Sequence, residues 1–87
     1  MSRMELRFSA AAARALAQMP QREAAAILRK LRTVATEPFG SHPWAKRLQG
    51  EDGYRARQGD WRAVYRIDRE LGVVIVERVE HRREVYR

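Results

Sequence analysis

The residues best suited to chemistry lie in two segments, Gly53 to Arg66 (GYRARQGDWRAVYR) and His81 to Arg87 (HRREVYR). Both are typical of strands or strand ends, in which successive side chains point to opposite faces. On this pattern Arg55 and Arg57 share one face of a first strand, and Arg62 lies on the arginine-bearing face of the next. Several guanidinium groups would therefore project from one side of a short sheet. That arrangement suits the binding, and also the cleavage, of a polyanion.

The elements that must position these residues can be predicted from periodicity and turn residues. Ser9 stands where a helix N-cap belongs, and Pro20 suits the first turn of a second helix. The segment from Glu37 to Lys46 (EPFGSHPWAK) holds two prolines and a glycine, which favours a loop. The remaining predicted elements are a strand at Met4–Phe8, a helix at Ala10–Met19, and strands at Tyr54–Gln58, Trp61–Asp68 and Val73–Val79.

This order predicts one α+β domain over residues 1–87. We expect two N-terminal helices to pack on one face of a small, mainly antiparallel four-stranded sheet. The apolar side of the second helix, with Ile27, Leu31 and Val34, and the strand residues Trp61 and Tyr65 would form the core between the layers. The other face of the sheet would be open and lined with arginine.

Composition narrows the function classes. The chain has 87 residues, a net charge of +7 and no cysteine, and only Lys30 and Lys46 of its 18 basic residues are lysines. An arginine excess favours an acidic partner such as nucleic acid, because the planar guanidinium fork matches phosphate. With no cysteine and two histidines, we expect no disulfide, metal or cofactor. No apolar run approaches the roughly 18 residues of a membrane span, and the start MSRMELRFSA has no signal-peptide core, so we expect a cytoplasmic protein.

Together these motifs resemble a known family. The resemblance rests on three segments: KRLQG (Lys46 to Gly50), the block GYRARQGDWRAVYRI that follows it, and the C-terminal pattern V-x-H-R-x-x-V-Y. With these segments the chain resembles the RelE/ParE superfamily of bacterial type II toxins, the RelE side more closely. The resemblance covers nearly the whole chain, including the order of elements. It implies a ribosome-dependent endoribonuclease that cleaves translated mRNA and is held inactive by an acidic antitoxin encoded next to it. It implies contact with operator DNA only as the toxin–antitoxin complex, and none with a membrane.

The resemblance also assigns roles to residues of this chain. The basic residues of the family's sheet correspond to Arg55, Arg57 and Arg62, the last-strand arginine to Arg82, and the C-terminal aromatic residue to Tyr86. The predicted catalytic residues are Arg57, Arg62, His81, Arg82 and Tyr86, and the predicted RNA-binding residues are Lys46, Arg47, Arg55 and Arg83. Two features depart from the family pattern. Glu80 stands where a glycine often precedes the H-R pair, and the tail is shorter than in some members.

The chemistry of RNA cleavage restricts which side chains can act as general acid or base. Metal-free RNA cleavage deprotonates a 2′-OH, stabilises a pentacoordinate phosphorane and protonates the leaving 5′-oxygen. Arginine performs the middle task well but is a poor general base, because its pKa is above about 12. Our hypothesis is that the three predicted catalytic arginines neutralise the phosphate while Tyr86 positions or deprotonates the 2′-OH. His81 is a second acid–base candidate, with Asp60 and Glu84 behind it.

Three function classes remain open. They are the ribosome-dependent ribonuclease, a ParE-like DNA gyrase inhibitor of the same fold, and a non-catalytic basic module that binds nucleic acid. The joint presence of Arg62, Arg82 and Tyr86 favours the ribonuclease, because a gyrase binder does not need a clustered phosphate site with a terminal tyrosine. The absence of a clear general base keeps the gyrase inhibitor open.

Overall fold

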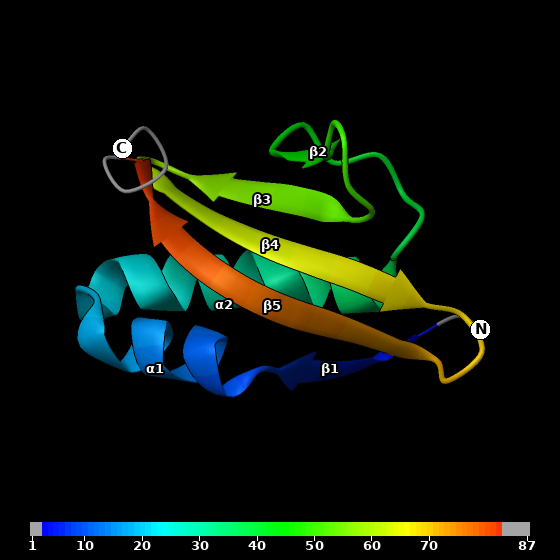
Figure 1. Ribbon diagram of the computed structural model, residues 1–87, viewed down its shortest axis with the longest axis horizontal. Coiled ribbons are helices and arrows are strands. Elements are labelled where there is room, and N and C mark those ends of the chain that lie inside the picture. Colours follow the sequence, from blue (N-terminus) through cyan, green and yellow to red (C-terminus); the bar gives the residue numbers. More distant parts are fainter. Residues whose placement is uncertain (1–2, 83–87) are drawn as a thin grey trace.

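The computed structural model describes residues 3–82, which form a five-stranded sheet and two helices (Figure 1). The elements are β1 (Glu5–Phe8), α1 (Ala10–Gln18), α2 (Gln21–Thr36), β2 (Ala45–Arg47), β3 (Tyr54–Gln58), β4 (Trp61–Asp68) and β5 (Val73–His81). The strand order across the sheet is β1-β5-β4-β3-β2. The β1–β5 pair is parallel, and the three other pairs are antiparallel. The α+β class is confirmed.

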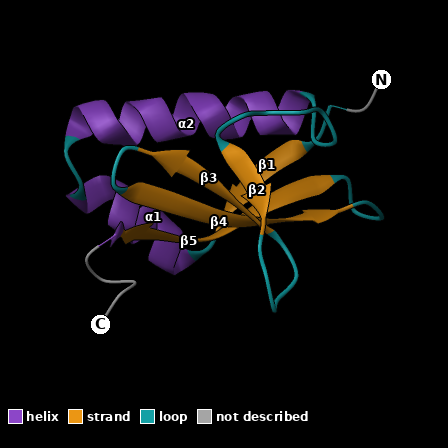
Figure 2. Ribbon diagram, turned by 90° about the horizontal axis from the view of Figure 1, so that it is seen from above, coloured by secondary structure: helices purple, strands orange, loops and turns teal. Residues whose placement is uncertain are grey.

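Two details of the predicted fold are wrong. The described residues form five strands instead of four, because β2 occupies the end of the segment predicted to be a loop. Pro43 and Gly40 suggested a loop there, but three residues beyond Pro43 are enough to pair with β3. The description of the helices as N-terminal is also inexact, because β1 precedes them, in keeping with the strand predicted at Met4–Phe8. Figures 1 and 2 show α2 crossing behind the sheet, whereas α1 continues from β1 along the β5 edge.

The core lies between α2 and the sheet. Ile27, Leu31 and Val34 of α2 are almost fully buried, as their helical spacing predicted. They pack in one cluster with Tyr65 of β4, and Trp61 packs against the same cluster from its rim. Burial of its ring raises the pKa of Tyr65 to about 12, with a smaller contribution from nearby Tyr54. The prediction that these strand aromatics belong to the core is confirmed.

A bulge in β5 decides which of its residues face the open side. Val64 pairs with Arg78 but Tyr65 pairs with Val76, so Glu77 is an extra residue in the ladder. Strict alternation from Val76 would turn Arg78 towards the helices. The bulge reverses this phase, so that Val79 joins the core and Arg78 faces outward.

Ser9 fixes this bulge to the start of α1. Its hydroxyl donates to the carbonyl of Glu77 (2.6 Å) and accepts from the Ala12 amide (3.0 Å). Its own amide donates to the carbonyl of Val76 (2.9 Å). One serine therefore caps the helix and holds the irregular stretch of β5 in place.

Candidate RNA-binding face and active site

The arginines of β3 and β4 meet on the open face of the sheet. Arg57 and Arg62 are directly opposite one another across the β3–β4 ladder, and Lys46 is opposite Arg55 across β2–β3. Side chains opposite one another in antiparallel strands share a face and lie close together. The Gly59–Asp60 turn closes this hairpin, with Gly59 at a φ of 58°. The alternation of the sequence thus predicted correctly which cations share a face.

Arg62 has the most distinctive environment of these residues. Its Nη1 atom is buried and has no hydrogen-bond partner within the described part of the chain. A buried donor without a partner costs about 1–3 kcal/mol, and more for a charged group. An anion could accept a hydrogen bond there, and so recover that cost, once the atoms that cover this nitrogen move aside. A phosphate oxygen has the charge and the lone pairs to do so.

Glu80 is an acidic residue on this basic face. It is the direct partner of Arg62 across the β4–β5 ladder. Its Oε2 lies 3.3 Å from Nε of Arg78, whose Nη2 is 3.2 Å from Oε1 of Glu51. Burial opposes the charge of Arg78, but the two carboxylates outweigh it and raise the pKa of that guanidinium. The sequence marked Glu80 as a departure from the family, but the bulge that puts it on the same face as Arg62 was not predicted.

The two described catalytic candidates at the end of β5, Arg82 and His81, are placed differently relative to the Arg57–Arg62 pair. The Arg82 amide donates to the Asp60 carbonyl (2.6 Å), and its Nη1 is 4.0 Å from the Asp60 carboxylate. Arg82 therefore lies at the same end of the sheet as the Arg57–Arg62 pair. His81 lies on the helix side, edge-on to Trp61 with ring centroids 4.8 Å apart, and is not brought together with that pair. Arg83 and Tyr86 lie outside the described residues, as does Glu84.

Lys30 and Trp44 support the strand that carries Arg57, and the sequence did not predict this role. The Lys30 ammonium on α2 donates to the Arg57 carbonyl (2.7 Å) and lies 5.6 Å from the centre of the Trp44 ring. The Arg57 amide donates to the Trp44 carbonyl (2.8 Å). Partial burial lowers the pKa of Lys30, against a smaller opposing effect of Glu23. Both backbone groups of Arg57 are therefore bound, and its side chain remains exposed.

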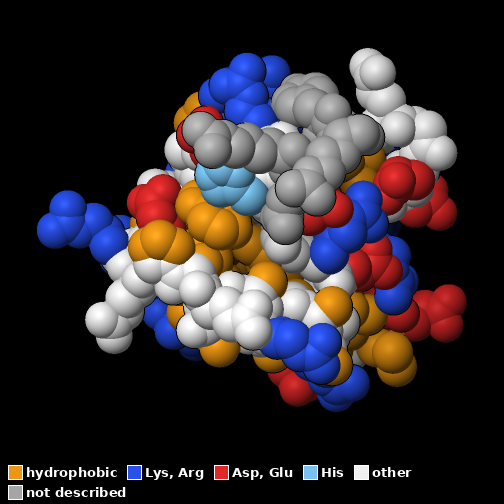
Figure 3. All heavy atoms as spheres, turned by 60° about the vertical axis from the view of Figure 1, so that its left-hand side comes forward, with side chains coloured by type: hydrophobic (Ala, Val, Ile, Leu, Met, Phe, Trp, Pro, Cys, Tyr) orange, Lys and Arg blue, Asp and Glu red, His pale blue; other side chains and the backbone are white. Residues whose placement is uncertain are grey.

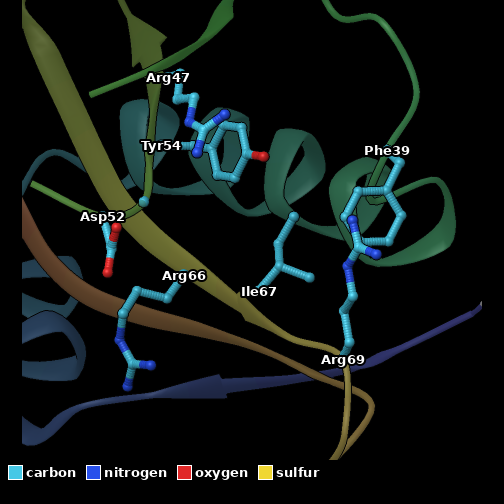
Figure 4. Close-up of a pocket in the computed structure, with 8 residues that line it drawn as sticks. Phe39, Arg47, Asp52, Tyr54, Arg66, Ile67 and Arg69 are labelled. Atoms are coloured by element: carbon cyan, nitrogen blue, oxygen red, sulfur yellow. The ribbon is translucent and has the colours of Figure 1, made fainter. Parts of the chain in front are cut away.

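A line of three adjoining hollows runs from this site along the β2 edge. The first is lined by Pro43, Trp44, Lys46, Arg55 and Arg57, and the second by Lys46, Arg47, Leu48, Gln49 and Arg55. The third, of about 260 Å³, lies between Arg47 with Tyr54 on one side and Phe39 with Arg69 on the other (Figure 4). Because neighbouring hollows share Lys46, Arg55 or Arg47, they form one basic track, which passes around the β2 edge from Lys46 and Arg55 on the open face to Arg47 beside Tyr54 on the other.

The end of the molecule at the β3–β4 turn has both charged and apolar side chains on its surface. Figure 3 shows apolar side chains near its centre, with basic and acidic side chains around them. Among residues 3–82, no group of three His, Cys, Asp or Glu side chains could hold a metal ion. Neither described helix is long and apolar enough to cross a membrane.

The fold and the basic face define a class that the comparisons with known proteins identify. Residues 6–86 match the family described as the ParE toxin of the type II toxin–antitoxin system, parDE. Toxin RelG of Mycobacterium tuberculosis is 36% identical over 84 residues, which cover 94% of each chain. The chain therefore belongs to the ParE toxin family of type II toxin–antitoxin systems, within the RelE/ParE superfamily.

Solved structures agree with this assignment. The toxin–antitoxin complex RelBE2 from M. tuberculosis contains a chain with a TM-score of 0.76 and 35% identity, covering 94% of both chains. A free RelE toxin of E. coli in which two arginines are replaced by alanine has a TM-score of 0.79 and 25% identity, covering 99% of this chain and 92% of that one. The RelE–RelB complex of Pyrococcus horikoshii, at 23% identity, a TM-score of 0.78, and coverage of 94% of this chain and 97% of that one, shares the fold.

Proposed function

We propose that this toxin is a metal-independent endoribonuclease that cleaves mRNA on the ribosome and so blocks translation. The observation that carries the proposal is the Arg57–Arg62 pair, whose members are directly opposite one another on the open face of the sheet. Relatives named RelG and RelE support it, because the sequence motifs resemble the RelE side of the superfamily. The basic track would hold the message on either side of the cleaved bond.

In this mechanism the 2′-oxygen attacks the adjacent phosphorus and the bond to the 5′-oxygen breaks. The products are a 2′,3′-cyclic phosphate and a 5′-hydroxyl. Arg57, Arg62 and Arg82 would stabilise the charge that builds up on the phosphorane oxygens. Tyr86 would position or deprotonate the 2′-OH, and His81 would be an alternative acid or base. Because His81 packs on Trp61, a direct role for it requires its ring to turn away from that contact.

We propose that the partner is an acidic antitoxin, because a +7 chain with an open cationic face needs charge compensation. Similar toxins were solved in complex with RelB antitoxins. A partly disordered antitoxin segment would fold on the toxin, and its proteolysis would release the activity. Operator DNA would be bound only by the complex. We propose that the toxin acts in the cytoplasm, where translated mRNA is present.

The test replaces Arg62 by alanine. Ribosome-dependent cleavage should fall by about 100-fold or more, as when one oxyanion donor is removed. The free energy of unfolding should be unchanged or higher, because the lost guanidinium leaves no partner unsatisfied. Mapping of transcript 5′ ends after induction measures cleavage, and urea denaturation measures stability.

The matched control is Arg14→Ala, which removes an equal charge from the exposed side of α1. This variant should cleave like the unmodified toxin. Tyr86→Phe tests the proton role separately and should lower the rate without weakening RNA binding. Cleavage at the unmodified rate by both Arg57→Ala and Arg62→Ala would show that the proposed site is wrong.

The family description favours a second candidate, inhibition of DNA gyrase, because the matching family is that of ParE toxins. Induction would then give filamentous cells with damaged DNA instead of cleaved transcripts. A gyrase supercoiling assay with purified toxin distinguishes the two. Inhibition at toxin concentrations that leave ribosome-bound mRNA intact would support the gyrase function.

A further inference from the structure

The hollow at the far end of the basic track has the features of a nucleotide site. Phe39 is 52% exposed, although a large apolar ring is normally buried. The Arg69 guanidinium carbon lies 4.4 Å from the centre of that ring. Across the hollow Arg47 lies beside the Tyr54 ring, with Ile67 between the two sides (Figure 4). Two aromatic–guanidinium combinations thus flank an apolar floor.

The walls of this hollow are held in place by the fold. Tyr54 stacks on the buried Tyr65 ring, with centroids 5.5 Å apart. Gly53 brings the β2–β3 turn so close that a Cβ atom there would be 2.8 Å from the Tyr65 carbonyl. A preformed wall of this kind lowers the ordering cost of binding.

The charge of the hollow favours an anionic occupant. Arg47, Arg66 and Arg69 line it together with one acidic residue, Asp52. The Arg66 guanidinium is bound to Glu77 (2.6 Å) and in Figure 4 points away from the hollow. Arg47 and Arg69 are therefore the cations placed to receive a phosphate group.

We infer that this hollow binds one nucleotide of single-stranded RNA, with its base on the exposed Phe39 ring and its phosphate on Arg47 or Arg69. Stacking on an aromatic ring tolerates any base and contributes substantially to single-strand binding. The adjoining hollows, which share Arg47 and then Lys46 with Arg55, connect it around the β2 edge to Arg57, and this continuity favours RNA over an acidic peptide. Ile67 is five positions beyond Arg62 on β4, roughly 16 Å along the strand, and its side chain packs on the helix side, so the hollow meets the open face only around the β2 edge.

This inference deepens the proposed function, on which it rests for the choice of RNA as ligand. It adds a binding site for a nucleotide distant from the cleaved bond. That nucleotide could belong to the message or to ribosomal RNA, and both present the same base and phosphate. The Phe39 hollow would then help fix the position of the toxin on its substrate and take no part in bond breaking.

The experiment measures binding to a fluorescent 12-nucleotide 2′-O-methyl RNA, which cannot be cleaved by attack of its 2′-oxygen. Phe39→Leu should weaken binding by about tenfold through loss of stacking. Phe39→Trp should keep the affinity, and the fluorescence of the new tryptophan should be quenched by the RNA. Arg69→Ala should also weaken binding. Phe8→Leu, the same change at an exposed ring on β1, is the matched control and should have no effect.

Two further arms identify the source of the nucleotide and exclude a protein ligand. The affinity of Phe39→Leu for ribosomes without message tests for ribosomal RNA, and its affinity for the antitoxin tests for a protein-binding role. Loss confined to the oligonucleotide supports a message nucleotide, and loss with empty ribosomes supports a ribosomal one. Loss confined to the antitoxin, or unchanged affinity in every arm, would overturn the inference.

The two proposals fail in different ways. If the unmodified toxin does not cleave ribosome-bound mRNA but Phe39→Leu still loses RNA affinity, the proposed function is wrong and the nucleotide site stands. If the toxin cleaves and Phe39→Leu binds RNA normally, the nucleotide site alone is wrong.

Discussion

At the scale of single residues, the basic face is defined as much by Glu80 as by its arginines. Its carboxylate is paired with Arg78 and lies across the ladder from Arg62, so its negative charge competes with that of a phosphate approaching this face. Because the Glu80 side chain is 35% exposed, water screens part of this competition. The residue should therefore tune RNA affinity moderately rather than block the site.

We predict that Glu80→Gln raises the affinity for non-cleavable RNA. The change removes a negative charge while keeping a similar shape, so the gain should be about two- to fivefold at low salt, as expected for a screened charge. Fluorescence anisotropy measures it, and the gain should shrink when salt is added. Glu51→Gln removes the second carboxylate from Arg78 without touching Arg62 and should give a smaller gain. A loss of affinity in Glu80→Gln would contradict the competition.

Residue positions were predicted well wherever strict alternation applies. Arg55, Arg57 and Arg62 face the open side because β3 and β4 are regular and joined by a tight turn. Contacts made across the fold could not be predicted in this way. Lys30 reaches the Arg57 carbonyl from α2, 27 positions earlier, and no local pattern encodes that contact.

At the scale of elements, the bounds of β3 and β4 were predicted as observed, because Gly59 and Asp60 mark the turn between them. β2 was missed because three residues are too few to show a period. The β5 bulge was missed, although the two successive charged residues Glu77 and Arg78 interrupt the alternation between Val76 and Val79. The contact that fixes it, from Ser9 to Glu77, joins positions 68 residues apart.

We predict that the turn before β3 depends on Gly53. This glycine has a φ of 117°, and a Cβ atom would approach the Tyr65 carbonyl to 2.8 Å. Gly53→Ala should lower the free energy of unfolding by about 2–3 kcal/mol through strain and steric conflict. Gly50→Ala is the matched control in the same turn, with a φ of 81° but open space around it, and should cost only about 1 kcal/mol. Urea denaturation measures both, and equal losses would show that the close approach does not matter.

At the scale of the whole molecule, the net charge of +7 is not spread evenly. The β2 edge carries a continuous row of cations, whereas several arginines elsewhere are paired with carboxylates. Arg7 binds Glu5 and Arg66 binds Glu77. Association with RNA should therefore depend on the row rather than on total charge.

We predict that the affinity for RNA depends strongly on salt concentration, because the row of cations at the β2 edge binds phosphates. The cations concerned are Lys46, Arg47, Arg55, Arg57 and Arg62. If each neutralises one phosphate, the plot of log affinity against log salt should have a slope of about −3.5. Arg55→Gln should make that slope shallower by about 0.7, and Arg14→Gln should leave it unchanged. Equal changes of slope for both variants would mean that RNA affinity depends on the net charge and not on the positions of the cations.

The parallel pairing of β1 with β5 has a consequence for how the toxin is made. β5 lies between β1 and β4 in the sheet, yet it is the last strand of the described chain to be synthesised. Until Val73 to His81 leave the ribosome, β1 has no neighbour, and Glu80 and Arg78 are not yet beside the β4 arginines. Such long-range pairing forms late and slowly. The arginine-bearing face of the sheet is therefore complete only once β5 has been made and has paired with β4.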